Sequence, residues 1–272
     1  MQHPEAPSPS LPRAAGEGDT ALPKSGTVQT ASSPSPAPRG RGQGRGPDRL
    51  LLWDIDGTLV NCGPQVRPLF AQSLIDVYGT AGACDSYDFA GRTDPRIVID
   101  LITATGLPEE EVRRRLPEVR SLYLGRLEEG LEREGMRLLP GVVELLERLA
   151  ARSDLTLALL TGNWEPGART KLSRFDLNRF FAFGAFGCDG TDRDELPPVA
   201  LDRAEQRAGR RFHPTETLII GDSLHDVSCA RAHGIPCLAV ATGRTPAGSL
   251  RAAGADWVAA DLPEALAMIE WW

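Results

Sequence analysis

From Leu50 onward, short apolar runs alternate with stretches of helical character. The segment VVELLERLAAR (142–152) has apolar residues at helical spacing, and LHDVSCARAHG (224–234) stops at a glycine with Pro236 just beyond. Five apolar runs predict strands: LLLWD (50–54), LTLALLT (155–161), TLIIGD (217–222), PCLAVAT (236–242) and ADWVAAD (255–261). Strands that alternate with helices predict an α/β fold with a parallel sheet covered on both faces.

The segment 64–137, between the first two predicted strands, reads as almost wholly helical. Within it, DPRIVIDLITATG (94–106) offers Asp94 as an N-cap, Pro95 at the first helical position and Gly106 as a stop. A long charged stretch follows, with apolar residues at helical spacing and an interruption at Pro117. This segment is too long for a simple crossover, so we expect a helical cap (64–137) over a core formed by residues 49–63 and 138–272.

Residues 1–48 differ in composition from the rest of the chain. They are rich in Pro, Ser, Ala and Gly and lack apolar periodicity, which predicts a disordered tail. The run RGRGQGR (39–45) could bind RNA or an acidic surface, or it could be a solvated linker.

Composition and charge narrow the class of protein. The chain has 272 residues, a formal net charge of −7, 41% hydrophobic residues and 25% charged residues, which are ordinary values for a globular protein. The mild acidity argues against nucleic acid as the main partner. No apolar run reaches the roughly 18 residues of a membrane helix, and we find no secretory pattern. We therefore expect a cytoplasmic protein, monomer or homodimer, without a membrane partner.

The cysteines agree with a reducing compartment. Their number is odd and no pair has CxxC spacing, so we expect free thiols rather than a disulfide framework. The five are Cys62, Cys84, Cys188, Cys229 and Cys237.

Polar residues gather where three of the predicted strands end. Asp54 and Asp56 follow the first strand, and Asp222 and Asp226 follow the third. Carboxylates two residues apart on an extended backbone point to the same side and repel, and burying either one unpaired is costly. A metal ion would offset that cost. Because ligands of such sheets lie at the carboxyl ends of the strands, we expect one site there, which also includes Thr161, Gly162 and Asn163.

Three motifs in the same order resemble those of the haloacid dehalogenase superfamily: DIDGTLV (54–60), LLTGN (159–163) and GDSLHDV (221–227). The resemblance covers residues 50 to about 260 and implies a Rossmann-like parallel sheet with helices on both faces and an inserted helical cap. GRTDPRI (91–97) is similar to cap segments of the phosphoglycolate phosphatase-like group.

The resemblance implies a Mg²⁺-dependent phosphoric monoester hydrolase acting on a small phosphorylated metabolite. Asp54 would be both nucleophile and metal ligand, forming an aspartyl-phosphate. Asp56 would protonate the leaving group and then activate water, and its backbone carbonyl would bind the metal. Asp222 would bind the metal directly, and Asp226 would bind it directly or through water. The phosphate oxygens would be held by Thr161, Gly162 and Asn163.

The third motif of the superfamily departs from its usual pattern. The family usually has a lysine there, but the chain has only two lysines, and Lys24 lies in the tail. We assign the role to Arg193, which precedes LPP (196–198) and would hold phosphate as a permanent cation. The alternatives are Lys171, whose position suggests a surface or packing residue, and Arg203.

Other assignments remain open at this point. A sugar-phosphate mutase would use the same core residues, and a non-catalytic binding protein would act through its RG-rich tail. The presence of Asp56 favours phosphoester chemistry over dehalogenation, because attack on carbon needs no proton donor there. Arg92 could meet the anionic end of the substrate or be a salt-bridged cap residue. We expect His225 to be a first-turn helix residue rather than a catalyst.

Overall fold

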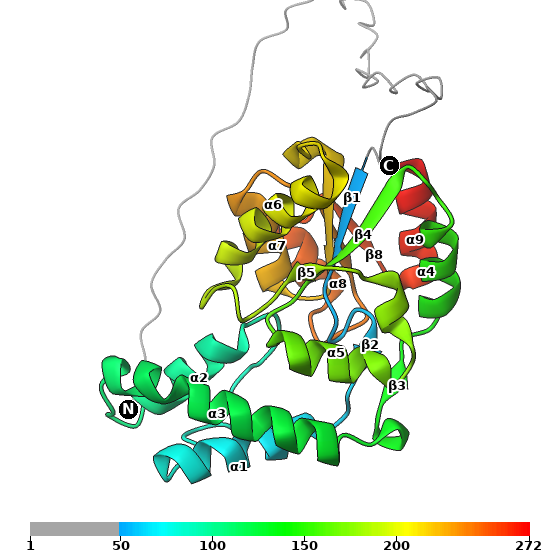
Figure 1. Cartoon of the computed structure of the whole chain (residues 1–272). Coiled ribbons are helices and arrows are strands. Elements are labelled where there is room, and N and C mark those ends of the chain that lie inside the picture. The colour runs from blue at the N-terminus through cyan, green and yellow to red at the C-terminus, as the bar shows by residue number, and fades with distance from the viewer. Residues whose placement is uncertain (1–48) are drawn as a thin grey trace, which may run out of the picture. The chain divides into compact units, whose positions relative to one another are not determined.

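A computed structural model describes residues 49–272, so the predicted tail and its RG-rich run lie outside the described residues. The described part of the chain is built on a six-stranded sheet with the order β5-β4-β1-β6-β7-β8 (Figure 1). Every neighbouring pair in this sheet is parallel. The strands are β1 (Arg49–Trp53), β4 (Leu155–Leu160), β5 (Gly184–Ala185), β6 (Thr217–Gly221), β7 (Cys237–Val240) and β8 (Trp257–Ala259). The predicted α/β fold with a parallel sheet is thus confirmed.

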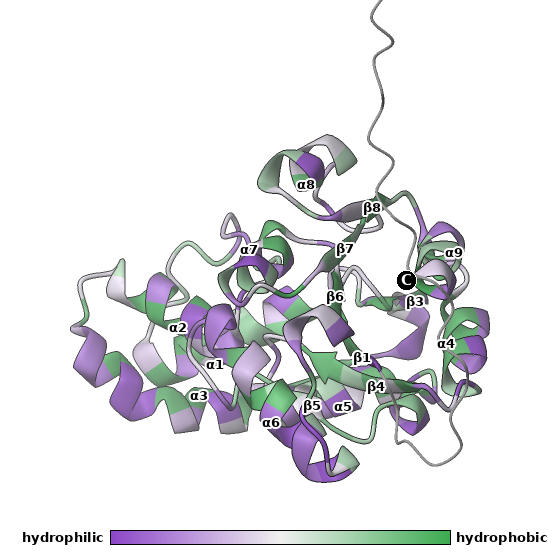
Figure 2. Cartoon of the chain, turned by 90° about the horizontal axis from the view of Figure 1, so that it is seen from above, coloured by the Kyte–Doolittle hydropathy of each residue, from purple (hydrophilic) through white to green (hydrophobic). Residues whose placement is uncertain are grey.

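Helices cover both faces of this sheet because its strands are apolar on both sides. Leu51 and Trp53 of β1 belong to one buried cluster, together with residues of α4 (Val142–Ala150), α5 (Glu165–Ser173) and α9 (Leu262–Trp271). Leu50 and Leu52 point into a second cluster, which contains residues of α6 (Leu196–Ala208), α7 (Leu224–Ala232) and α8 (Ala247–Ala253). Figure 2 shows the strands in hydrophobic colours, with hydrophilic residues on the surrounding helices. Such two-sided burial is typical of parallel sheets.

The segment inserted after β1 contains three helices: α1 (Val66–Tyr78), α2 (Asp94–Thr103) and α3 (Glu109–Gly130). They pack together and are flanked by a small antiparallel ribbon of β2 (Val60–Asn61) and β3 (Arg137–Leu138) (Figure 1). Four short 3₁₀ helices complete the described elements: η1 (Arg133–Gly135), η2 (Leu177–Phe180), η3 (Arg193–Glu195) and η4 (Pro214–Glu216).

Three details of the inserted segment differ from the sequence prediction. Residues 79–93 form turns and loops, so the segment is not almost wholly helical. Thr93 is the N-cap of α2, because its side chain accepts a hydrogen bond from the Arg96 N–H, and Asp94 is the first helical residue. Pro117 does not interrupt α3, because the packing of its buried face outweighs the one lost backbone hydrogen bond.

The sequence predicted free thiols and no membrane-spanning helix. All five cysteines are free, as expected, although Cys188 is exposed whereas the other four are buried. Within residues 49–272, none of the helices combines the length and the apolar character needed to cross a bilayer.

Candidate active site

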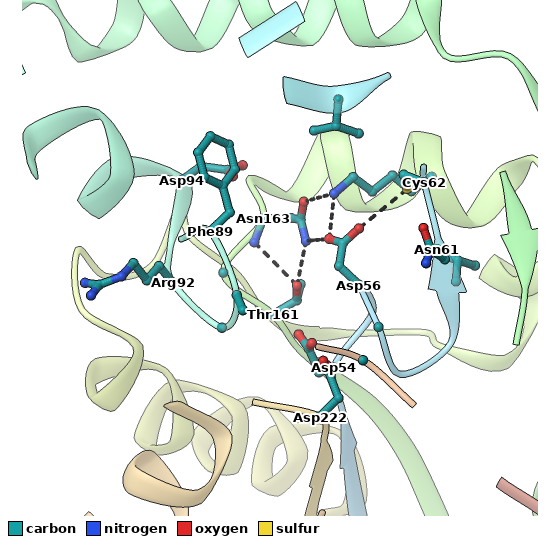
Figure 3. Close-up of a pocket in the computed structure, with 18 of the residues that line it drawn as sticks. Asp54, Asp56, Asn61, Cys62, Phe89, Arg92, Asp94, Thr161, Asn163 and Asp222 are labelled. Carbon is teal, nitrogen blue, oxygen red and sulfur yellow. Dashed lines mark hydrogen bonds and ion pairs between the residues drawn. The ribbon is translucent and has the colours of Figure 1, made fainter. Parts of the chain in front are cut away.

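The fold brings three acidic side chains together at the carboxyl ends of two neighbouring strands. Asp54 follows β1, Asp222 follows β6, and Asp226 lies in the first turn of α7. All three are buried, and one carboxylate oxygen from each lies within 4.8 Å of the others. Figure 3 shows Asp54 and Asp222 side by side below Asp56 and Thr161. The parallel pairing of β1 with β6 therefore produces the cluster that the sequence motifs predicted.

Arg193 lies against this cluster, as the sequence predicted. It is only 5% exposed, and its Nη2 donates to Asp54 Oδ1 at 3.1 Å, to the Leu160 carbonyl at 3.0 Å and to Asp226 Oδ1. Its Nε has no hydrogen-bond partner among the described residues. Arg203, the alternative, instead forms an ion pair with Asp189 at 2.7 Å and is not part of this cluster.

Burial and mutual repulsion make the acidic cluster costly to ionise. The pKa of Asp54 is raised to about 7, chiefly by burial, with Arg193 acting to lower it and the charges of Asp226 and Asp56 acting to raise it. Burial likewise raises the pKa of Asp222 to about 8, assisted by the charges of Asp54 and Asp226. The one guanidinium therefore does not fully compensate three carboxylates.

These residues fit a divalent cation. Mg²⁺ prefers oxygen ligands, and a second positive centre would relieve the repulsion that Arg193 leaves. The backbone also leaves space beside Asp222: a Cβ at Gly57 would lie 2.5 Å from its Oδ2, and a Cβ at Gly243 would lie 1.6 Å away. Gly57 has φ +85°, a conformation that glycine adopts without strain. Asp54 and Asp222 could thus hold a divalent metal ion.

Asp56 belongs to a separate hydrogen-bonded network (Figure 3). Its Oδ2 accepts from Lys171 Nζ at 2.6 Å and from Asn163 Nδ2 at 2.8 Å. Lys171 also donates to Asn163 Oδ1 at 2.6 Å, and Asn163 Nδ2 donates to Thr161 Oγ1 at 2.8 Å. Although burial acts to raise the pKa of Asp56, the Lys171 ammonium outweighs it and lowers that pKa. The network links the residues after β4 to the second aspartate of the first motif.

Lys171, interpreted as a surface or packing residue, does not lie on the surface. Its side chain is almost fully buried and paired with Asp56. The signal was present in the sequence: Ala168 and Leu172, three residues before and one after, form the buried face of α5 with it. A lysine on an apolar helix face needs a partner, and only the fold reveals that Asp56 provides it.

Gly162 brings the inserted segment close to the loop after β4. Its carbonyl accepts from the Asp94 N–H at 2.8 Å, and a Cβ at this position would lie 2.1 Å from the Arg92 carbonyl. The Asp94 carboxylate in turn accepts from the Trp164 N–H at 2.8 Å. A larger residue at 162 would force these backbones apart.

A cavity of about 280 Å³ lies between this loop and the inserted helices. Its lining includes Asp54, Asp56, Asp94 and Asp222 but not Asp226. The inserted segment contributes Arg67, Phe70, Phe89, Arg92 and Tyr123. Arg92 forms an ion pair with Asp100 at 3.4 Å, which agrees with its interpretation as a salt-bridged cap residue. It also lines the cavity, so a contact with the substrate stays open. His225 is the second residue of α7 and does not line it.

The buried Asp94 gives a prediction for stability. Burial raises its pKa from 3.8 to about 6, which corresponds to about 3 kcal/mol. The folded chain therefore binds this proton more tightly than the unfolded chain. The stabilisation by the bound proton is complete below pH 4 and is lost as the pH rises through about 6. We expect Asp94→Asn, which keeps the oxygen facing Trp164, to raise the free energy of unfolding by about 3 kcal/mol at pH 8 and by little at pH 4.

Urea unfolding of both proteins at the two pH values measures this difference. The exposed Asp85 in the same inserted segment provides a control, and Asp85→Asn should change stability little at either pH. An equal gain for Asp94→Asn at both pH values would contradict the assignment of the cost to the buried charge.

The site and sheet together define an α/β protein with a buried acidic centre at its strand ends. Comparison with known sequences gives the family: the profile of the haloacid dehalogenase-like hydrolases matches residues 51–240, and the chain belongs to this family. The chain is 28% identical over 201 residues to phosphoglycolate phosphatase 1 of Pseudomonas aeruginosa, a match that covers 72% of this chain and 70% of the relative. It is 29% identical over 196 residues to a phosphoglycolate phosphatase of Pseudomonas syringae pv. tomato, with the same coverage.

A solved structure agrees in fold. The crystal structure of a predicted phosphatase from Clostridium acetobutylicum superposes with a TM-score of 0.63 at 18% identity, covering 82% of this chain and 99% of that one. At this identity the agreement concerns the fold alone.

Proposed function

We propose that this hydrolase is a Mg²⁺-dependent phosphatase of small phosphorylated metabolites, acting through an aspartyl-phosphate on Asp54. The observation that carries the proposal is the buried cluster of Asp54, Asp222 and Asp226 against Arg193, beside a cavity of metabolite size. The relatives named as phosphoglycolate phosphatases support phosphate-ester chemistry.

In the first half-reaction, an Asp54 oxygen attacks the phosphorus of the ester. The bond between phosphorus and the leaving oxygen breaks, and the leaving oxygen takes a proton from Asp56. Asp56 lies two residues from the nucleophile, and its side chain is 40% exposed toward the cavity side. It is therefore accessible to a leaving group, and Asp54, although almost fully buried, also lines the cavity.

In the second half-reaction, Asp56 takes a proton from a water molecule that attacks the same phosphorus. The phosphate departs and the Asp54 carboxylate is restored. Bound Mg²⁺ would offset the repulsion between the anionic ester and the carboxylates. Asp54, Asp222 and the Asp56 carbonyl would hold it, while both oxygens of Asp226 already accept hydrogen bonds from Ser223 and Arg193, which favours an indirect role.

The phosphate itself is assigned to the residues after β4 and to Arg193. The unpartnered Nε of Arg193 offers a donor that needs an acceptor. The Thr161 hydroxyl and the backbone amides after it lie at the end of β4, beside the nucleophile's strand. We assign substrate selection to the inserted segment, which supplies much of the remaining cavity wall, and Arg92 is our candidate for contacting an anionic end.

Phosphate release from a panel of phosphorylated metabolites, with and without Mg²⁺, tests the proposal. The panel includes phosphoglycolate, sugar phosphates, nucleoside monophosphates and an aryl phosphate. We expect release from at least one member to fall about 100-fold or more when Mg²⁺ is removed with a chelator and to return when it is restored. Isomerisation of a sugar phosphate without net phosphate release would instead indicate a mutase. A folded protein inactive on every member would contradict the phosphatase proposal.

A further inference from the structure

Lys171 is a buried cation that the proposed chemistry does not use. Its side chain is 4% exposed, and within residues 49–272 its ammonium donates to two members of one network, at 2.6 Å to Asp56 Oδ2 and at 2.6 Å to Asn163 Oδ1. A buried ammonium is costly unless it is paired and hydrogen-bonded, so this geometry is maintained against a substantial desolvation cost.

The two carboxylate oxygens of Asp56 have different hydrogen-bond donors. Oδ2 accepts from both Lys171 Nζ and Asn163 Nδ2, whereas the one donor to Oδ1 within residues 49–272 is the Cys62 thiol, a weak donor 3.5 Å away. One oxygen is thus fixed by two strong donors. The other remains available to a group in the cavity.

Two buried cations of the site, Arg193 and Lys171, are divided between the two aspartates of the first motif. Arg193 contacts Asp54, and Lys171 contacts Asp56. Lys171 lies on α5 and Arg193 lies on η3, so separate elements supply the two cations. Removal of Lys171 should therefore affect steps that depend on Asp56, and leave the contacts around the nucleophile in place.

We propose that Lys171 is a positioning residue that holds Asp56 for hydrolysis of the phosphorylated Asp54, an inference that rests on the proposed function. With Oδ2 held, Oδ1 accepts a proton from the attacking water as the water oxygen bonds to phosphorus. The bond between phosphorus and the Asp54 oxygen breaks, and its electron pair returns to the Asp54 carboxylate. Asp56 then carries the proton that protonates the next leaving group. The Lys171–Asp56 ion pair requires Asp56 to be a carboxylate. This is the state of Asp56 between the half-reactions, after it has given its proton to the leaving group.

The test separates the two half-reactions of Lys171→Met with 4-nitrophenyl phosphate, whose leaving group needs little protonation. We expect the rate of the first turnover, read as a burst of nitrophenol, to change less than about 10-fold. The steady rate after the burst should fall about 100-fold, the usual size of a general-base contribution, and acid-quenched enzyme should accumulate phosphorylated Asp54. Arg169→Met is the matched control, because Arg169 lies on the same helix, pairs with Glu165, and does not line the cavity.

Each outcome bears on the inference. Equal loss of burst and steady rates, or no loss at all, overturns the positioning role while leaving the phosphatase proposal intact. Phosphate release that does not need Asp54 overturns both. If Lys171→Met does not fold, the double variant with Asp56→Asn removes both partners and leaves no unpaired charge. Its burst and steady rates should match those of Asp56→Asn alone within about 3-fold, and a further 10-fold loss in either rate would show that Lys171 acts elsewhere.

Discussion

Asp54→Asn is expected to lower kcat/KM for phosphate release by about 10⁴-fold or more, the scale of loss when a covalent nucleophile is removed. The amide keeps the shape of the carboxylate but cannot form the acyl-phosphate bond. Because burial raises the pKa of Asp54 to about 7, the substitution also removes a costly buried charge, so we expect the variant to stay folded. Phosphate release and circular dichroism measured on the same preparation check both expectations.

The matched control for this substitution is Asp202→Asn. Asp202 is an exposed residue of α6 and does not line the cavity, so its loss should change kcat/KM less than 2-fold. If Asp54→Asn retained more than about a tenth of the wild-type activity, Asp54 would not be the nucleophile.

Arg193→Met is expected to give the second largest effect, on both activity and stability. The guanidinium contacts Asp54 and Asp226, and its removal leaves two buried carboxylates without their cation. We expect a loss of about 3–5 kcal/mol in the free energy of unfolding, as for other broken buried pairs. Activity should fall about 100- to 1,000-fold, because a preorganised cation beside the transferring phosphoryl group is lost.

Urea unfolding and phosphate release distinguish this arginine from its alternative. Arg203→Met breaks a partly exposed pair with Asp189 and a hydrogen bond to the Gly184 carbonyl. It should change stability by about 2 kcal/mol or less, with activity nearly unchanged. Arg193→Lys should recover part of the activity, since it keeps the charge but loses the fork of donors. A larger loss of activity for Arg203→Met than for Arg193→Met would contradict the assignment.

The acidic centre could be predicted from the sequence because its geometry follows from simple rules. A buried strand gives a continuous apolar run, and residues after neighbouring parallel strands meet at one edge. Asp54 and Asp222 follow both rules, so their proximity could be predicted from the sequence alone. Arg193 was identified by resemblance to a motif, and the structure brings it to the same edge.

The partner of Lys171 and the strand β5 could not be predicted because they depend on tertiary contacts. β5 has two residues, too few for a periodic pattern, and exists because β4 offers it a free edge. Lys171 is a long side chain on a helix, and its direction toward Asp56, 115 residues earlier, is set by how α5 packs. The Pro117 prediction failed for a related reason, since local helix propensity was outweighed by the packing of α3.

The measurement that tests the central claim most directly is chemical trapping of the phosphorylated intermediate. Wild-type protein is mixed with Mg²⁺ and an active phosphate ester, quenched in acid and reduced with borohydride, which converts an aspartyl-phosphate to homoserine. Mass spectrometry of the peptide containing β1 should then find homoserine at position 54, and none in protein quenched without the ester. Homoserine at another aspartate, or rapid turnover with no modified residue, would contradict covalent catalysis by Asp54.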